Sequence, residues 1–81
     1  MTTEQIAFYP HNYEQIWPGI DAKIAAPYVM LNVNYLDNGC MILDSVNIYK
    51  REMMLMSEQG FRILLDEITS YVSRYNTAEI C

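Results

Sequence analysis

A turn signal at Asp37-Asn38-Gly39, between two apolar stretches, most constrains what this chain can fold into. Before the turn, Tyr28–Leu36 alternates apolar and polar residues, which is typical of a half-buried strand. Asp, Asn and Gly tolerate a positive φ, so we expect the chain to reverse there with Gly39 in the left-handed region. Residues 40–49 would form the return strand. Its alternation changes parity, which predicts a β-bulge near Asp44-Ser45. The first strand should bury Val29, Leu31, Val33 and Tyr35.

A helix is predicted to follow the hairpin, from Ser57 to Asn76. Ser57 is suited to be its N-cap. Gly60 in the first turn costs up to about 1 kcal/mol relative to alanine, so we interpret it as a mark of close backbone approach. Six apolar residues recur with a period of 3.6 and should form the stripe that packs on the sheet. These residues are Phe61, Leu64, Leu65, Ile68, Val72 and Tyr75.

Two segments near this unit carry weaker patterns. Residues 50–52 are interpreted as a turn and Met53–Met56 as a short third strand. In residues 20–26, alternation favours a strand, whereas the spacing of Ile20 and Ile24 fits one helical turn, so both alternatives stay open.

The amino-terminal segment is predicted to be helical. Thr3 is placed to cap a helix over Glu4–Tyr9, and Asn12 to cap one over Tyr13–Trp17. A proline ends each of them, because proline cannot continue a helix.

These elements predict an α+β fold. It consists of an antiparallel meander of three or four strands, an amphipathic carboxy-terminal helix on one face and short amino-terminal helical segments. Eighty-one residues suit one domain, divided into a helical or irregular segment 1–19, a sheet 20–56 and a helix 57–76.

Composition limits where the chain acts and what it binds. Apolar residues make up 52% and charged residues 19%, which favours a folded chain over a disordered one. The first residues lack the pattern of a signal peptide, and no stretch approaches the about 18 apolar residues of a membrane span, so we expect a soluble, cytoplasmic protein without a membrane partner. Ten acidic and five basic residues give a charge of −5, which argues against direct nucleic-acid binding and suits a basic protein surface.

No pattern of chemical groups indicates catalysis. His11 is the only histidine, and no nucleophile motif accompanies it. Asp66 and Glu67 point about 100° apart on a helix, so they cannot share a proton. Cys40 and Cys81 lack metal-ligand spacing, and a bridge between them is less favoured than free thiols. We therefore expect no catalytic residue, metal or cofactor, and not an enzyme.

The chain is instead rich in residues typical of binding surfaces, with seven tyrosines, one tryptophan, six methionines and six asparagines. Tyr9, Tyr13 and Trp17 are spaced at four residues and should form one aromatic face, which either packs on the sheet or anchors a partner. Asn32 and Asn34 are predicted on the sheet face that the long helix leaves uncovered. These five residues are the predicted partner-binding set.

Elimination therefore leads to a small acidic protein-binding factor, most economically an inhibitor or antagonist of a partner protein. Proteins of this type include phage inhibitors of bacterial defence, such as anti-CRISPR proteins, and immunity proteins, although no motif here matches them. The alternative is a structural or adaptor subunit that acts as a homo-oligomer such as a homodimer.

Overall fold

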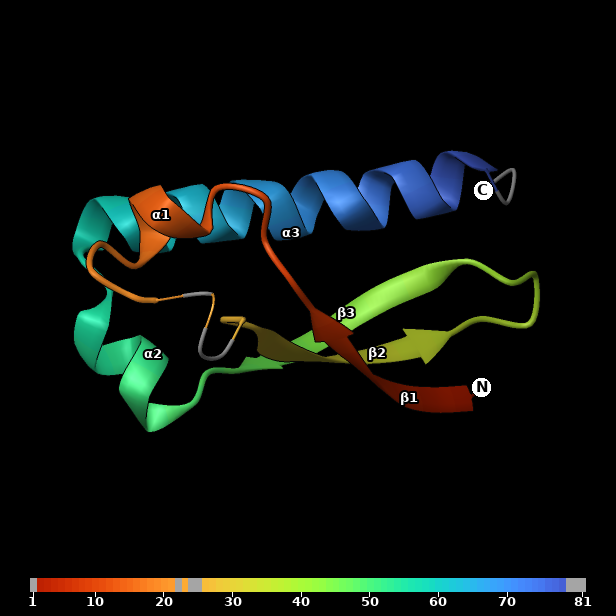
Figure 1. Cartoon of the computed structure of the whole chain (residues 1–81). Coiled ribbons are helices and arrows are strands. Elements are labelled where there is room, and N and C mark those ends of the chain that lie inside the picture. The colour runs from red at the N-terminus through yellow and green to blue at the C-terminus, as the bar shows by residue number, and fades with distance from the viewer. Residues whose placement is uncertain (1, 22, 24–25, 79–81) are drawn as a thin grey trace.

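The computed structural model describes residues 2–21, 23 and 26–78, which form two layers (Figure 1). A three-stranded antiparallel sheet lies below, and the helices α1 and α3 lie above it (Figure 1). The predicted α+β fold, with a long carboxy-terminal helix on one face of an antiparallel sheet, is confirmed. The elements in chain order are β1 (Thr2–Phe8), α1 (Tyr13–Ile16), β2 (Val29–Tyr35), β3 (Met41–Asn47), α2 (Lys50–Leu55) and α3 (Glu58–Ala78).

The hairpin of β2 and β3 follows the sequence pattern closely. Gly39 has a φ of 90°, as predicted for the left-handed position of the turn. Ser45 pairs with Asn32 but Leu43 pairs with Val33, so Asp44 is the extra residue of a bulge. The bulge restores the inward orientation of the apolar residues on both sides of it.

The core lies between the sheet and α3. It contains the inward side chains of β2, the two central apolar residues of α3, and residues contributed by α1 and its C-cap position. Its buried members are Ile16, Trp17, Val29, Leu31, Val33, Met41, Leu64 and Ile68.

Two details fix how α3 sits. The hydroxyl of Ser57 accepts a hydrogen bond from the Gly60 N–H at 3.0 Å, which confirms the predicted N-cap. A Cβ on Gly60 would lie 2.6 Å from the carbonyl oxygen of Ile16, so glycine here permits the close approach of α1 that the sequence indicated.

The far end of α3 is attached to the sheet by a polar side chain as well as by the ring contact of Tyr75 with Tyr35. Asn76 accepts a hydrogen bond from the Met41 N–H at 2.7 Å and donates one to the Met41 carbonyl at 3.0 Å. The amide thus imitates a neighbouring strand at the beginning of β3.

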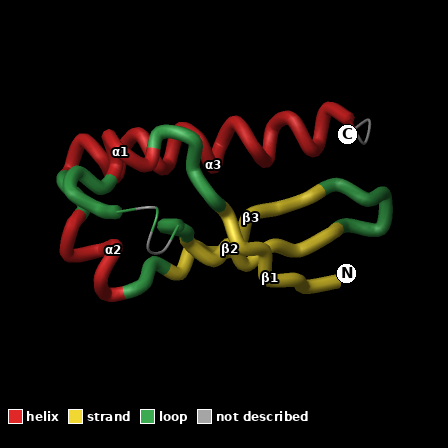
Figure 2. Tube along the Cα trace, in the orientation of Figure 1, coloured by secondary structure: helices red, strands yellow, loops and turns green. Residues whose placement is uncertain are grey.

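The helix predicted over Glu4–Tyr9 is wrong, because residues Thr2–Phe8 form β1. Ile6 and Phe8 alternate with polar residues, and β1 pairs with β2 along its whole length, with Ile6 opposite Leu31. Pairing with a strand distant in sequence therefore overrides the local signal of Thr3. The chain rises from β1 to α1, which lies beside α3 (Figure 2).

The third strand predicted at Met53–Met56 is also wrong. Residues Lys50–Leu55 form the helix α2, so the segment interpreted as a turn is the first half of a helix. Met, Leu, Lys, Arg and Glu are all strong helix formers, and four consecutive apolar residues have no period that separates helix from strand. Around residues 20–26, Ile20, Asp21, Lys23 and Ala26 are not in a strand, and positions 22, 24 and 25 lie outside the described residues.

Part of the predicted helical stripe does not reach the core. Leu64 and Ile68 are buried, but Phe61 and Leu65 each remain 39% exposed. They lie on the flank of α3, whereas Ile63 and Tyr71 on the other flank pack against the core. The period of the pattern was correct, and the angle at which the helix meets the sheet was not.

The expectation of free thiols does not hold for Cys40, which is buried and is not a free thiol. Cys81 lies outside the described residues. None of the described helices combines the length and apolar character needed to cross a bilayer.

Candidate protein-binding surface

The face of the sheet opposite α3 carries no charge at its nine paired strand positions. Because Val29, Leu31 and Val33 point into the core, the alternate residues of each strand point away from it. We call these nine residues the outer face. In three cross-strand rungs, they are Thr3, Asn34 and Ile42; Gln5, Asn32 and Ser45; and Ala7, Met30 and Asn47.

Hydrogen bonds fix the two central asparagines of the outer face. The Thr3 hydroxyl donates to Oδ1 of Asn34 at 2.8 Å, and Nδ2 of Asn32 donates to the Ser45 hydroxyl at 2.9 Å. Within the described residues, this leaves Nδ2 of Asn34 and Oδ1 of Asn32 for a partner. The amides are therefore oriented before anything binds.

Three tyrosine rings extend the outer face at one end of the sheet. Tyr9 follows β1, Tyr28 precedes β2, and Tyr49 follows β3 by two residues. The rings of Tyr9 and Tyr28 meet edge to face at 5.2 Å between centroids, and those of Tyr28 and Tyr49 at 5.3 Å. Tyr9 is 54% exposed and Tyr49 is 47% exposed. We call these three residues the tyrosine row.

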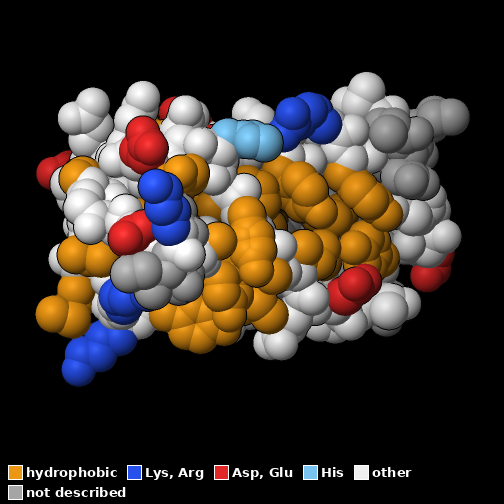
Figure 3. All heavy atoms as spheres, viewed as in Figure 1, with side chains coloured by type: hydrophobic (Ala, Val, Ile, Leu, Met, Phe, Trp, Pro, Cys, Tyr) orange, Lys and Arg blue, Asp and Glu red, His pale blue; other side chains and the backbone are white. Residues whose placement is uncertain are grey.

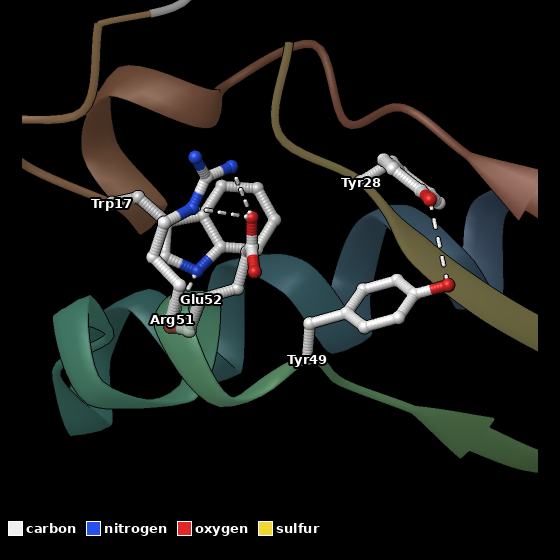
Figure 4. Close-up of polar contacts among 5 residues, drawn as sticks. All are labelled: Trp17, Tyr28, Tyr49, Arg51 and Glu52. Atoms are coloured by element: carbon white, nitrogen blue, oxygen red, sulfur yellow. Dashed lines mark hydrogen bonds and ion pairs between the residues drawn. The ribbon is translucent and has the colours of Figure 1, made fainter. Parts of the chain in front are cut away.

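The centre of the row is also linked by its hydroxyl groups. The Tyr28 hydroxyl donates to that of Tyr49 at 3.4 Å, and Figure 4 shows the two side chains directed toward one another. This hydrogen bond and the charge that Tyr49 would carry raise the pKa of Tyr28. Tyr28 therefore stays neutral to a higher pH than an isolated tyrosine.

The polar groups next to the row are paired within the chain. Arg51 makes an ion pair with Glu52, and the carbonyl of Glu52 accepts a hydrogen bond from Nε1 of Trp17 at 2.8 Å (Figure 4). Lys50 is exposed and follows Tyr49 directly, so the border of the row is not acidic.

The structure separates the aromatic residues that were predicted to act together. Trp17 is fully buried, and Tyr13 is half-buried against the core. Only Tyr9 is exposed, because it precedes α1 and does not share a helical face with the other two. The predicted face of Tyr9, Tyr13 and Trp17 does not exist.

Asn32 and Asn34 do lie on the uncovered face of the sheet, as the alternation predicted. Sequence reasoning missed Tyr28 and Tyr49 as companions of Tyr9. Their shared position just beyond the strand ends was a usable signal, but it required knowing that β1 is a strand.

A second feature is an open apolar groove of about 900 Å³ between β1, α1 and α3. Figure 3 shows this hydrophobic surface from the β1 side, with a histidine and basic side chains along its upper border. Ile6, Phe8, Ile63 and Tyr71 supply its apolar lining. Its polar lining includes His11, Asn12, Gln15, Asp66, Glu67, Ser70, Ser73 and Arg74.

The groove brings His11 near Glu67, but the carboxylate holds the backbone. The two oxygens of Glu67 accept hydrogen bonds from the N–H groups of His11 at 2.8 Å and Asn12 at 3.2 Å. Glu67 thus fixes the loop that precedes α1 to α3. Among residues 2–21, 23 and 26–78, no three potential metal ligands lie together.

Comparison of the chain with protein-family models, curated proteins and solved structures finds no match.

Proposed function

We propose that this protein is a non-enzymatic protein-binding factor whose contact surface is the outer face together with the tyrosine row. The observation that carries the proposal is the absence of charge at nine neighbouring, uncovered strand positions. A surface exposed only to water in a small domain typically carries about 25–35% charged residues. A sheet face with nine uncharged paired positions, bordered on β3 by the exposed bulge residue Asp44, is suited to being covered by another protein.

The composition of the surface supports the same conclusion. Tyr9, Tyr28 and Tyr49 offer large rigid contact areas at low entropic cost, while asparagine and serine supply adaptable hydrogen bonds. Antibody binding sites use this combination of residue types. The hydrogen bonds of Asn32 and Asn34 reduce the ordering needed on association.

The partner is expected to carry positive charge. A net charge of −5 speeds encounter with a basic protein, and exposed tyrosine rings attract Lys and Arg side chains. Binding would then block a cytoplasmic target by occlusion without turnover, as anti-CRISPR or immunity proteins do. Association should weaken as salt rises, because salt screens this attraction.

The test compares two arginine variants of exposed positions on opposite layers. Ser45→Arg places a charge in the outer face, whereas Thr69→Arg places the same charge on α3. A partner identified by affinity capture and mass spectrometry should bind Ser45→Arg about tenfold or more weakly, since the guanidinium would lose water on binding. It should bind Thr69→Arg like the original chain. Equal loss with both variants, or with neither, would remove the outer face from the interface.

A further inference from the structure

The two edges of the sheet differ in their protection against pairing with another strand. The β3 edge is interrupted by the Asp44 bulge, and both bulges and charges discourage addition of a strand. The β1 edge has seven residues, contains neither proline nor lysine, and pairs with β2 without interruption. Glu4 is the one charged residue of β1, and the edge is otherwise open to a further strand that places no carboxylate opposite it.

The inner side of the same edge is incompletely covered. α3 contacts β3 more extensively than β1, which it reaches through the pair of Phe8 and Tyr71 rings at 5.4 Å. Ile6 and Phe8 are only half-buried, although they belong to the inner, core-facing side of the sheet. The groove thus exposes to solvent apolar side chains that pack against the core.

The chain is less compact and exposes more surface than is typical of a monomeric domain of its length. The radius of gyration is 13.6 Å, with extents of 41 × 23 × 19 Å. A compact domain of this length would have a radius of gyration of about 12 Å. The accessible surface of 5489 Å² also exceeds the about 5,000 Å² expected for a monomer of this mass.

We propose that a second copy of the chain covers this edge, with β1 pairing antiparallel to β1 of the second copy about a two-fold axis at Gln5. The two sheets become one sheet of six strands, and each groove is closed by the other copy. The outer faces continue side by side on the opposite side of the sheet. The two proposed surfaces meet at β1, whose Thr3, Gln5 and Ala7 belong to the outer face, and at Tyr9, which also lines the groove.

The register follows from the residues of β1. With the axis at Gln5, all seven residues pair, and Glu4 lies opposite Ile6 of the second copy. Centring the pair on Glu4 would bring two carboxylates together and leave fewer residues paired. Glu4, the single charged residue of β1, thus favours the longest register.

The available surface approaches that of a standard interface. The groove lining and the four preceding residues of β1, Thr2–Gln5, offer 18 residues. One side of a standard interface uses about 20–30 residues. A closed two-fold arrangement also consumes both free β1 edges, which prevents growth into a fibre.

Solution mass tests the proposal, with neighbouring exposed positions of α3 as variant and control. The mass should be twice 9.5 kDa, and Ser70→Arg should raise the dimer dissociation constant about tenfold or more, since a guanidinium in the groove would be desolvated. Thr69→Arg, outside the groove, should leave it unchanged. A monomer at the highest soluble concentration, or equal effects of the two variants, would overturn the proposal.

Cross-linking tests the axis. Gln5→Cys should form a disulfide between copies under mild oxidation, because residues facing each other across the axis are about 5 Å apart at Cα. Thr3→Cys should not, since it would face position 7 of the second copy. Cross-linking of Thr3→Cys but not Gln5→Cys would refute this register. Rising salt should strengthen the dimer of two acidic chains, the opposite of its effect on a basic partner.

Discussion

The two faces of the sheet are made by alternate residues of the same three strands, yet they differ in almost every property. The inner face carries Leu31 and Val33, which are fully buried under α3. The outer face carries Asn32 and Asn34, which are hydrogen-bonded across the strands and uncovered. One residue of displacement along β2 separates a core position from a candidate contact position.

This difference places the residues that stabilise the fold and those of the proposed contact surface at alternate positions of a chain of 81 amino acids. Apolar burial on one face stabilises the fold. The paired positions of the other face are uncharged at the cost of little stability, because amides and hydroxyl groups remain hydrated or paired. Variants at adjacent positions should therefore differ in which property they change.

The largest contrast is expected between Leu31→Ala and Asn32→Ala. Leu31→Ala should lower the free energy of unfolding by about 2–5 kcal/mol, because it removes a fully buried side chain. Asn32→Ala removes one exposed hydrogen bond and should cost less than about 1 kcal/mol. Denaturant unfolding measures both. Similar losses would mean that the outer face is also buried, and the comparison would fail.

Gly60→Ala tests how tightly the inner layer is packed. The added methyl group would meet the backbone oxygen of Ile16, which is unable to rotate away, so α1 must shift. We expect a loss of about 1–3 kcal/mol in spite of the better helix propensity of alanine. Ser73→Ala on the exposed side of α3 is the control and should stay within about 0.5 kcal/mol. If Gly60→Ala raised the free energy of unfolding, α1 would have to lie further from α3 than the structure places it.

Leu65→Ala tests which side of α3 is buried against the sheet. Because Leu65 is 39% exposed, Leu65→Ala should lower the free energy of unfolding by about 1 kcal/mol. Ile68 is buried, so Ile68→Ala should lower it by about 2–5 kcal/mol. The sequence pattern placed both on one buried stripe and predicted equal losses. Thermal or denaturant melts measure both losses. Equal losses would support the helix orientation that the sequence pattern predicted.

Tyr49→Phe should have the smallest effect on stability and a specific effect on the tyrosine row. It removes the hydrogen bond that raises the pKa of Tyr28, so that pKa should fall toward its ordinary value. The raised pKa means that the fold favours the protonated Tyr28 hydroxyl. The contribution of this group to folding stability is present below about pH 10 and is lost as pH rises through the raised pKa. Spectrophotometric titration follows the ionisation of the tyrosines, and comparison with Tyr28→Phe identifies the signal of Tyr28. Tyr13→Phe is the control and should leave the pKa of Tyr28 unchanged.

The part of the fold that could be predicted is the part specified by neighbouring residues. The turn at Asp37-Asn38-Gly39, the bulge at Asp44 and the start of α3 at Ser57 each depend on local chemistry. β1 depends on β2, from which 20 residues separate it, and no local signal reports such a pairing. The helix α2 was missed because its residues have no alternation to measure.

The candidate site was predictable to the extent that β2 was. Asn32 and Asn34 were placed on the uncovered face by alternation alone. Trp17 was expected beside Tyr9, but it is buried where its Nε1 meets the carbonyl of Glu52, a contact between segments 35 residues apart. The row of Tyr9, Tyr28 and Tyr49 joins the ends of three strands and exists only once the sheet is assembled.

The amide of Asn76 has a consequence for the dynamics of the chain. Because it occupies both polar groups of Met41, the last turns of α3 cannot fray without also exposing the beginning of β3. The helix end and the hairpin are thereby joined into one cooperative unit. Hydrogen exchange at the Met41 amide should then report opening of this joined unit, although the amide lies at the start of a strand.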